Sequence, residues 1–284
     1  MLAAAYTAPL ALMTAIVVAG SGTAAATPGT DTLFIAENGN HMAVSLPVTG
    51  GTPKTVAQGL DHPYGLALSG NTLYVAVAGS DTIVSVPTSG GTPRTIATLT
   101  GAGPVGIAVS GNTLYVTEST GNVVSLPVTG GRPTTLATGL PNPQGIAVSG
   151  SRLLIAENAA AGAVVSVPVT GGTPTTVVSL TNPTAVAVSG NTVFVAESGG
   201  PVVSVPVTGG IPTTLTTLNI GQGIAVSGNT LYITVSNGEV VSLPTTGGTP
   251  AVVASGLNNP AGIAVGPGSG GCFGSICLPT GSSG

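Results

Sequence analysis

The feature that most constrains the fold of this chain is an internal repeat of about 40 residues. The triplet Ser-x-Pro occurs six times at the same phase, and its serines are separated by 40, 40, 41, 38 and 38 residues. A period of this size is typical of folds in which one supersecondary unit is copied and stacked. The serines are Ser45, Ser85, Ser125, Ser166, Ser204 and Ser242.

Each copy contains four short apolar segments that we interpret as strands. In the copy that spans 139–176 we expect strands at 146–148, 153–157, 164–167 and 175–178, separated by Gly, Asn, Pro or Ser. Four antiparallel strands in each copy predict an all-β fold, a six-bladed β-propeller.

The phase of the repeat predicts how the ring closes. The first copy begins at its second strand, within 31–37, whereas the last copy ends on a first strand, at 262–265. We therefore expect the C-terminal strand to complete the N-terminal blade, which removes the free sheet edges of an open array.

One position of the second strand carries a large side chain in every copy. Five of these six residues are aromatic, in a chain with only eight aromatic residues. We expect them to pack between blades, and an aromatic ligand platform is the alternative. The residues are Phe34, Tyr74, Tyr115, Leu154, Phe194 and Tyr232.

The ends of the chain differ from the repeat. Residues 1–20 are apolar, and three alanines at 24–26 supply a small-residue cleavage site, so segment 1–26 predicts a secretory signal peptide, with an uncleaved anchor as the alternative. The propeller should span 27–267, followed by a Gly- and Ser-rich tail at 268–284. In an exported chain, Cys272 and Cys277 predict a small disulfide loop. We expect a secreted or cell-envelope monomer without a stable membrane span, unless the signal stays uncleaved.

The few charges argue against one class of partner and separate onto two faces. The net charge is −4 with no basic run, so the footprint of a nucleic-acid binder is missing. Because antiparallel strands alternate in direction, the connection from the second to the third strand and the connection from the fourth strand to the next first strand lie on the same face. We call it the top face. It should carry seven of the eight acidic residues and both histidines, whereas Lys54, Arg94, Arg132, Arg152 and Asp31 belong below. An acidic mouth would attract cations, unless its carboxylates only accept turn N–H groups.

Candidate ligand-binding residues are polar side chains of the top face. His41, Asp61, His62 and Tyr64 depart from the other copies, and we expect them to gather in one sector, the alternative being independent loop residues. The full set is Glu37, His41, Asp61, His62, Tyr64, Glu118, Asn142, Gln144, Glu157, Asn182, Glu197, Gln222 and Asn259.

Four of these residues form a candidate metal site. Glu157, Glu197, Asn142 and Asn182 come from neighbouring copies and offer the oxygen ligands that Ca²⁺ or Mg²⁺ prefers. The sequence has no zinc motif, phosphate loop or Ser-His-Asp order, so no catalytic residue is assigned.

Segments 112–131 and 140–150 resemble NHL-type repeats, and are most similar to the extracellular propeller sensor of actinobacterial transmembrane Ser/Thr kinases. The resemblance covers about residues 30–266 and implies an exported six-bladed propeller that binds a ligand or a protein. The pairs Glu37-Asn38 and Glu157-Asn158 are similar to those of streptogramin lyase-like propellers.

Three functions are compatible with these patterns. The first is a non-enzymatic propeller that binds a ligand or protein at its top face. The second is a lyase or lactonase-like enzyme with a divalent cation at the same mouth, and the third is a cell-envelope scaffold. Carboxylates that converge on the axis would favour the enzyme, whereas carboxylates folded back onto their own loops would favour the binder or the scaffold.

Overall fold

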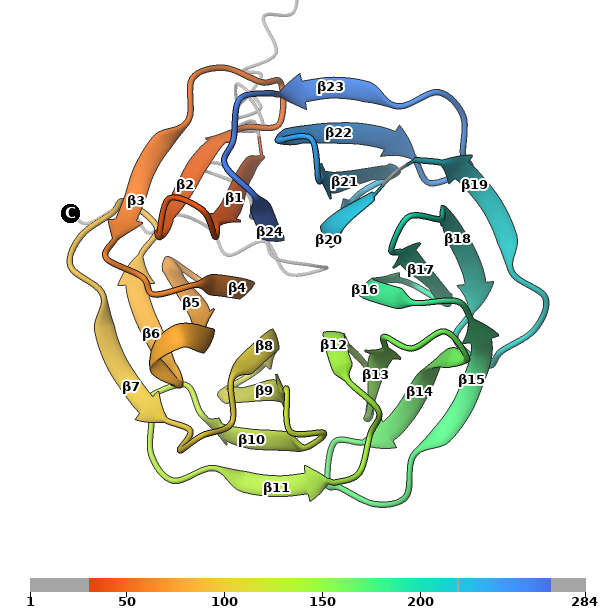
Figure 1. Ribbon diagram of the computed structural model, residues 1–284, viewed down its shortest axis with the longest axis horizontal. Helices are drawn as coiled ribbons and strands as arrows, with labels where there is room; N and C mark the ends of the chain where they lie inside the picture. Colours follow the sequence, from red (N-terminus) through yellow and green to blue (C-terminus); the bar gives the residue numbers. More distant parts are fainter. Residues whose placement is uncertain (1–30, 219, 267–284) are drawn as a thin grey trace, which may run out of the picture.

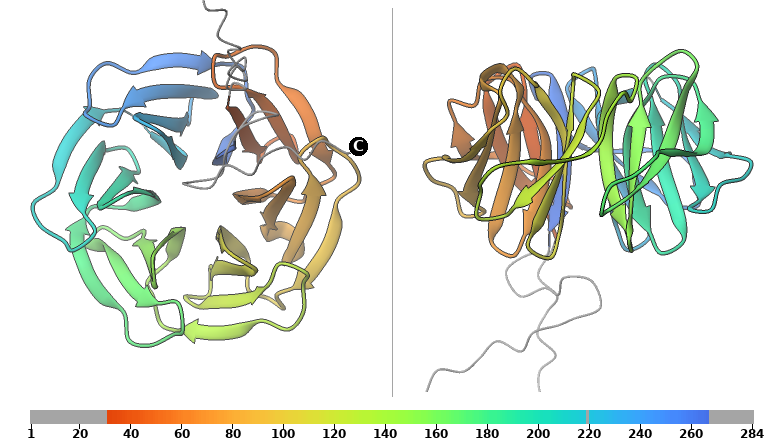
Figure 2. Two further views of the ribbon diagram at one scale, coloured as in Figure 1. Left: turned by 180° about the vertical axis from the view of Figure 1, so that it is seen from behind. Right: turned by 90° about the horizontal axis from the view of Figure 1, so that it is seen from below.

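The computed structural model describes residues 31–218 and 220–266, which form a ring of six four-stranded antiparallel sheets (Figure 1). Seen from the side, the ring is a disc with its connections on two opposite faces (Figure 2). The predicted six-bladed β-propeller is confirmed. The expected signal peptide, the tail, Cys272 and Cys277 lie outside the described residues. Within the described ranges, no helix has the length and apolar character needed to cross a bilayer.

The first strand of each blade lies next to the central axis (Figure 1). Five of these strands carry a glycine where neighbouring backbones approach most closely. A Cβ on Gly145, for example, would lie 2.7 Å from the Cα of Ala185 in the next blade. The inner strands are β4 (Pro63–Ser69), β8 (Pro104–Ser110), β12 (Pro143–Ser149), β16 (Pro183–Ser189), β20 (Ile220–Ser227) and β24 (Pro260–Gly266).

The second strand of each blade is the most deeply buried, and its alternate side chains face opposite neighbours. In β5, Leu73 and Val75 pack toward the preceding blade, whereas Tyr74 and Ala76 pack toward the following one. This is the two-residue period of a strand with both faces covered. The second strands are β1 (Thr32–Glu37), β5 (Thr72–Val77), β9 (Thr113–Glu118), β13 (Arg152–Glu157), β17 (Thr192–Glu197) and β21 (Thr230–Val235).

The third and fourth strands are progressively more exposed. Each third strand ends at the proline of Ser-x-Pro, and the outer strands are rich in threonine. The third strands are β2 (Met42–Pro47), β6 (Thr82–Pro87), β10 (Val123–Pro127), β14 (Gly162–Pro168), β18 (Pro201–Pro206) and β22 (Glu239–Pro244). The outer strands are β3 (Lys54–Gln58), β7 (Arg94–Thr98), β11 (Thr134–Ala137), β15 (Thr175–Leu180), β19 (Thr213–Thr217) and β23 (Ala251–Ala254). A single 3₁₀ turn, η1 (Ala78–Ser80), interrupts the described strands.

The core consists of six apolar clusters, one at each interface between blades. Each cluster contains one of the large second-strand residues from Phe34 to Tyr232, and all six are at most 8% exposed. The interpretation of these residues as inter-blade core is confirmed.

The ring closes as the repeat predicts. Strand β24 pairs antiparallel with β1, with Leu33 opposite Val265 and Ile35 opposite Ile263. Blade 1 is therefore built from β24, β1, β2 and β3, and blades 2 to 6 follow in chain order. The two ends of the repeat region share one sheet, so neither end is left as an unpaired edge at the seam.

Candidate functional site

Two sets of connections meet on the top face. One set joins the second and third strands, and the other leads from each blade into the inner strand of the next. Backbone hydrogen bonds tie the sets together, as where Leu60 N donates to His41 O (2.9 Å) and Leu99 N to Asp81 O (2.7 Å). Backbone hydrogen bonds thus join the two sets of connections on the top face.

A cavity of about 520 Å³ opens at the top end of the axis. We call it the axial cup. Five of the six blades contribute to its wall, which is lined by Tyr64, Ala78, Gly103, Val105, Ser119, Gln144, Asn158, Thr184, Ser198 and Gln222. Below it, the inner-strand glycines narrow the axis to a cavity of about 70 Å³. The cup is therefore a recess that narrows toward its floor.

Two positions of the repeat supply most of the cup. One is the second residue of the inner-strand motif Pro-x-Gly and its variants, which is Tyr64, Val105, Gln144, Thr184 or Gln222. The other directly follows the second strand, as Ser119 and Asn158 do. Our sequence analysis included Tyr64, Gln144 and Gln222 but missed Ser119, Asn158, Thr184 and Ser198. The sequence did contain a signal for these residues. At both positions the type of side chain differs from copy to copy, whereas the adjacent residues are nearly the same in every copy.

Hydrogen bonds hold several cup residues in place. Gln144 Nε2 donates to Asn142 Oδ1 (3.0 Å), and Asn158 Nδ2 donates to Asn182 O (3.2 Å). Ser119 Oγ donates to Ala102 O (2.9 Å). The hydroxyl and amide groups still have lone pairs or N–H groups to offer. Among the described residues that line the cup, none carries a formal charge. The arrangement suits an uncharged ligand with many hydrogen-bonding groups.

The predicted acidic mouth is less acidic than the sequence suggested, because three second-strand glutamates are buried. Glu37, Glu118 and Glu197 are only 5–7% exposed. Glu37 accepts a hydrogen bond from Asn258 N (2.9 Å), and Glu197 accepts one from Thr181 N (3.0 Å). Both carboxylates fold back onto the connection that enters their own blade.

Glu157 occupies the same position in blade 4 but differs in its surroundings. The residue of its connection that corresponds to Thr181 is Pro141, which has no N–H to donate. Burial raises the pKa of the half-buried Glu157 carboxyl. Burial also raises the pKa of Glu197, but there the hydrogen bond from Thr181 acts in the opposite direction. Glu157 thus lacks the backbone donor that Glu37 and Glu197 have, whereas Glu118 accepts from the side chain of Asn122 instead (3.0 Å).

The asparagines of the candidate set have a role in their turns. Asn142, Asn182 and Asn259 precede the turn proline with φ of 45°, 46° and 49°, a left-handed conformation that asparagine tolerates. Asn142 Nδ2 donates to Asn158 O (3.0 Å). The Ca²⁺ or Mg²⁺ site at Glu157, Glu197, Asn142 and Asn182 stays a prediction.

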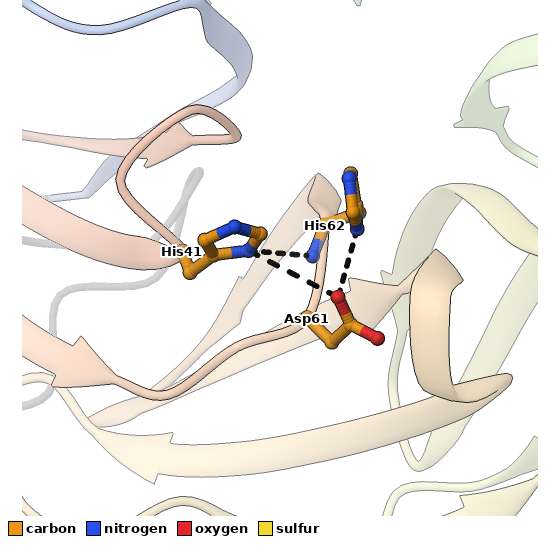
Figure 3. Close-up of side chains that lie close together, drawn as sticks. All are labelled: His41, Asp61 and His62. Carbon is orange, nitrogen blue, oxygen red and sulfur yellow. Dashed lines mark hydrogen bonds and ion pairs between the residues drawn. The ribbon is translucent and has the colours of Figure 1, made fainter.

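The structure brings His41, Asp61 and His62 together (Figure 3). His62 Nδ1 lies 2.8 Å from Asp61 Oδ1, and His41 Nδ1 lies 4.0 Å from the same oxygen. The two imidazole rings meet edge to face, with centroids 5.0 Å apart. Tyr64, two residues further on, lines the axial cup instead.

Comparisons with known proteins agree with a repeat propeller. The family model of the LVIVD repeat matches residues 220–241. No curated protein matches the chain. Among solved structures, a chain from the crystal structure of a nidogen/laminin complex is similar, with 19% identity and a TM-score of 0.75 over 83% of this chain and 98% of that one. At this identity the likeness concerns the fold alone. The chain is a repeat β-propeller.

Proposed function

We propose that this propeller is a binding protein whose axial cup takes an uncharged ligand rich in hydroxyl or amide groups, such as a saccharide. The observation that carries the proposal is the neutral polar lining of the cup, placed at the two repeat positions that vary. A volume of about 520 Å³ lies in the range of small-molecule sites. The nidogen/laminin structure supports binding as a use of this fold in another protein.

The chemistry of the wall favours a neutral ligand over an ion. Gln144, Gln222 and Asn158 offer amides, Ser119 and Ser198 offer hydroxyls, and Tyr64 adds an aromatic ring with a hydroxyl. Such groups fix the orientation of a ligand through paired donors and acceptors. A charged ligand would have to leave water without an opposite charge from the described lining, at a large cost.

The test is a screen of the full chain against arrays of neutral saccharides and uncharged peptides, followed by calorimetry on any ligand found. We expect the double variant Gln144→Ala/Gln222→Ala to weaken binding about tenfold or more. Each lost amide leaves a polar group of the bound ligand without its hydrogen-bond partner. Thr135→Ala, on the exposed face of β11, is the control and should bind normally. A ligand whose affinity ignores the cup variants would contradict the proposal.

We further propose that the protein acts outside the cytoplasm, as a secreted or cell-envelope protein. The support is the apolar 1–26 segment with its small residues, and the Cys272–Cys277 pair. Mass spectrometry of the extracellular protein should find an N-terminus near residue 27 and an oxidised cysteine pair. Recovery of the intact chain from the cytoplasm alone would contradict export.

A further inference from the structure

His41, Asp61 and His62 form the one group of three or more metal-ligating His, Cys, Asp or Glu side chains in the part of the chain that the structure describes. His41 lies in the loop between β1 and β2, and the other two lie in the connection between β3 and β4. They include both histidines of the chain. We propose that these three residues bind a divalent transition-metal ion of the Zn²⁺ class.

The spacing of the three side chains suits such an ion. One ligand atom from each residue lies within 4.8 Å of the other two. Zinc bonds imidazole nitrogen and carboxylate oxygen at about 2.0–2.2 Å, so a tetrahedral ion holds its ligand atoms about 3.3–3.5 Å apart. The separations of 2.8 and 4.0 Å from Asp61 Oδ1 to the two Nδ1 atoms lie on either side of that value. Small side-chain rotations would bring the three atoms around one ion.

The turns of the other blades show that this fold does not need histidine here. His62 has a φ of 53°, and the corresponding Asn142, Asn182 and Asn259 have nearly the same value. In blade 1, Asn258 occupies the place of Asp61. The turn therefore requires a residue that tolerates the left-handed conformation, and His62 is the one of the four that also ligates transition metals.

The surroundings leave the site open to a cation. The side chains of His41, Asp61 and His62 are 49–55% exposed, so an ion reaches them without unfolding the turn. Gly79 lies beneath the Asp61 carboxylate, where any Cβ would collide with it, and Gly79 N donates to Asp61 O (2.9 Å). Without metal, His41 Nδ1 accepts a weak hydrogen bond from His62 N (3.3 Å), which an ion would replace. Three protein ligands leave one position for water or a further ligand.

The test is calorimetric titration of ZnCl₂ into the tag-free full chain, with the visible spectrum of Co²⁺ as a second readout. We expect one ion per chain. His62→Asn and His41→Asn should each weaken Zn²⁺ binding by at least the 10–100-fold that follows loss of an outer-shell partner. His62→Asn introduces the residue found in the other turns, so the fold should be kept.

Two controls locate the site. The double variant His62→Asn/Asn142→His keeps two histidines but moves one to a turn without the aspartate, and should not restore binding. The variant Cys272→Ser/Cys277→Ser removes the thiols that also bind Zn²⁺ and should bind normally. Absence of Zn²⁺ binding, equal binding in the histidine variants, or loss in the cysteine variant would each overturn the proposal. None of these results bears on the axial cup, which is tested with uncharged ligands.

Discussion

At the scale of single residues, Glu157 and Glu197 share one position in the repeat but differ in their partners. Glu197→Ala leaves the Thr181 N–H without its acceptor, so we expect the free energy of unfolding to fall by about 1–3 kcal/mol. In the turn of Glu157 the residue corresponding to Thr181 is Pro141, which has no N–H to leave unpaired, so Glu157→Ala should cost less than half as much. Urea unfolding of the two variants beside the wild type measures the difference. Equal losses would mean that the backbone contact contributes little.

The raised pKa of Glu157 makes a prediction about pH. Because burial lifts this pKa above its ordinary value of 4.5, the folded protein holds the proton to a higher pH than the unfolded chain does. Glu157 makes its full contribution to the free energy of unfolding at pH values below its pKa in the unfolded chain. That contribution is lost as the pH rises through its pKa in the folded protein. The melting temperature of Glu157→Gln should therefore rise relative to wild type between about pH 4 and pH 7. A constant or falling difference over this range would contradict the assignment.

At the scale of elements, the inner strands depend on the absence of side chains where they approach each other. In Gly145→Ala the new Cβ would lie 2.7 Å from Ala185 Cα and 2.9 Å from Val186 N, so the backbone must shift. We expect a loss of about 1–3 kcal/mol in the free energy of unfolding, as for other overpacked sites. The matched variant is Ala185→Gly, which should cost only about 0.5–1 kcal/mol. Thermal melts of the two variants show which one lowers the melting temperature more. A larger loss in Ala185→Gly than in Gly145→Ala would contradict this account.

The strands were predictable because their signals are local. Turn residues and the two-residue apolar period mark each strand, and the phase of the repeat marks the closure by β24. The inner strand expected at 146–148 is longer, spanning Pro143–Ser149, and its register with β13 shifts between Pro143 and Ile146. A similar shift recurs between the inner and second strands of all six blades, and it interrupts the strict two-residue alternation from which the strand bounds were predicted.

The candidate site was predictable only in part, for the same reason. The predicted topology placed on one face the connections that contain the candidate residues, and His41, Asp61 and His62 do lie together. Which polar side chains turn toward the axis depends on the curvature of the whole ring. The bond from Asn258 to Glu37 joins residues 221 positions apart, and it converts an expected surface charge into a buried contact.

At the scale of the whole molecule, the predicted Ca²⁺ or Mg²⁺ site would couple two neighbouring blades. An ion held by Glu157, Glu197, Asn142 and Asn182 would stabilise the folded ring by about 2.7 kcal/mol at a hundredfold excess over its dissociation constant. Melting curves in millimolar Ca²⁺ and in chelator, repeated on Glu157→Gln/Glu197→Gln, measure this effect. An unmoved melting temperature and no heat of Ca²⁺ binding would end the metal interpretation at these residues.

The seam between β1 and β24 also sets an order of events in time. Among the described strands, β1 is synthesised first and its partner β24 is synthesised last. Before β24 is synthesised, blade 1 lacks its inner strand. The backbone edge of β1 that later pairs with β24, with Leu33 opposite Val265 and Ile35 opposite Ile263, then has no partner. Contacts this distant along a chain form slowly, and unpaired edges are prone to aggregate. A chain truncated before residue 260 would therefore lack β24 and leave β1 with an unpaired edge, so the seven residues of the last described strand complete the hydrogen bonding of blade 1.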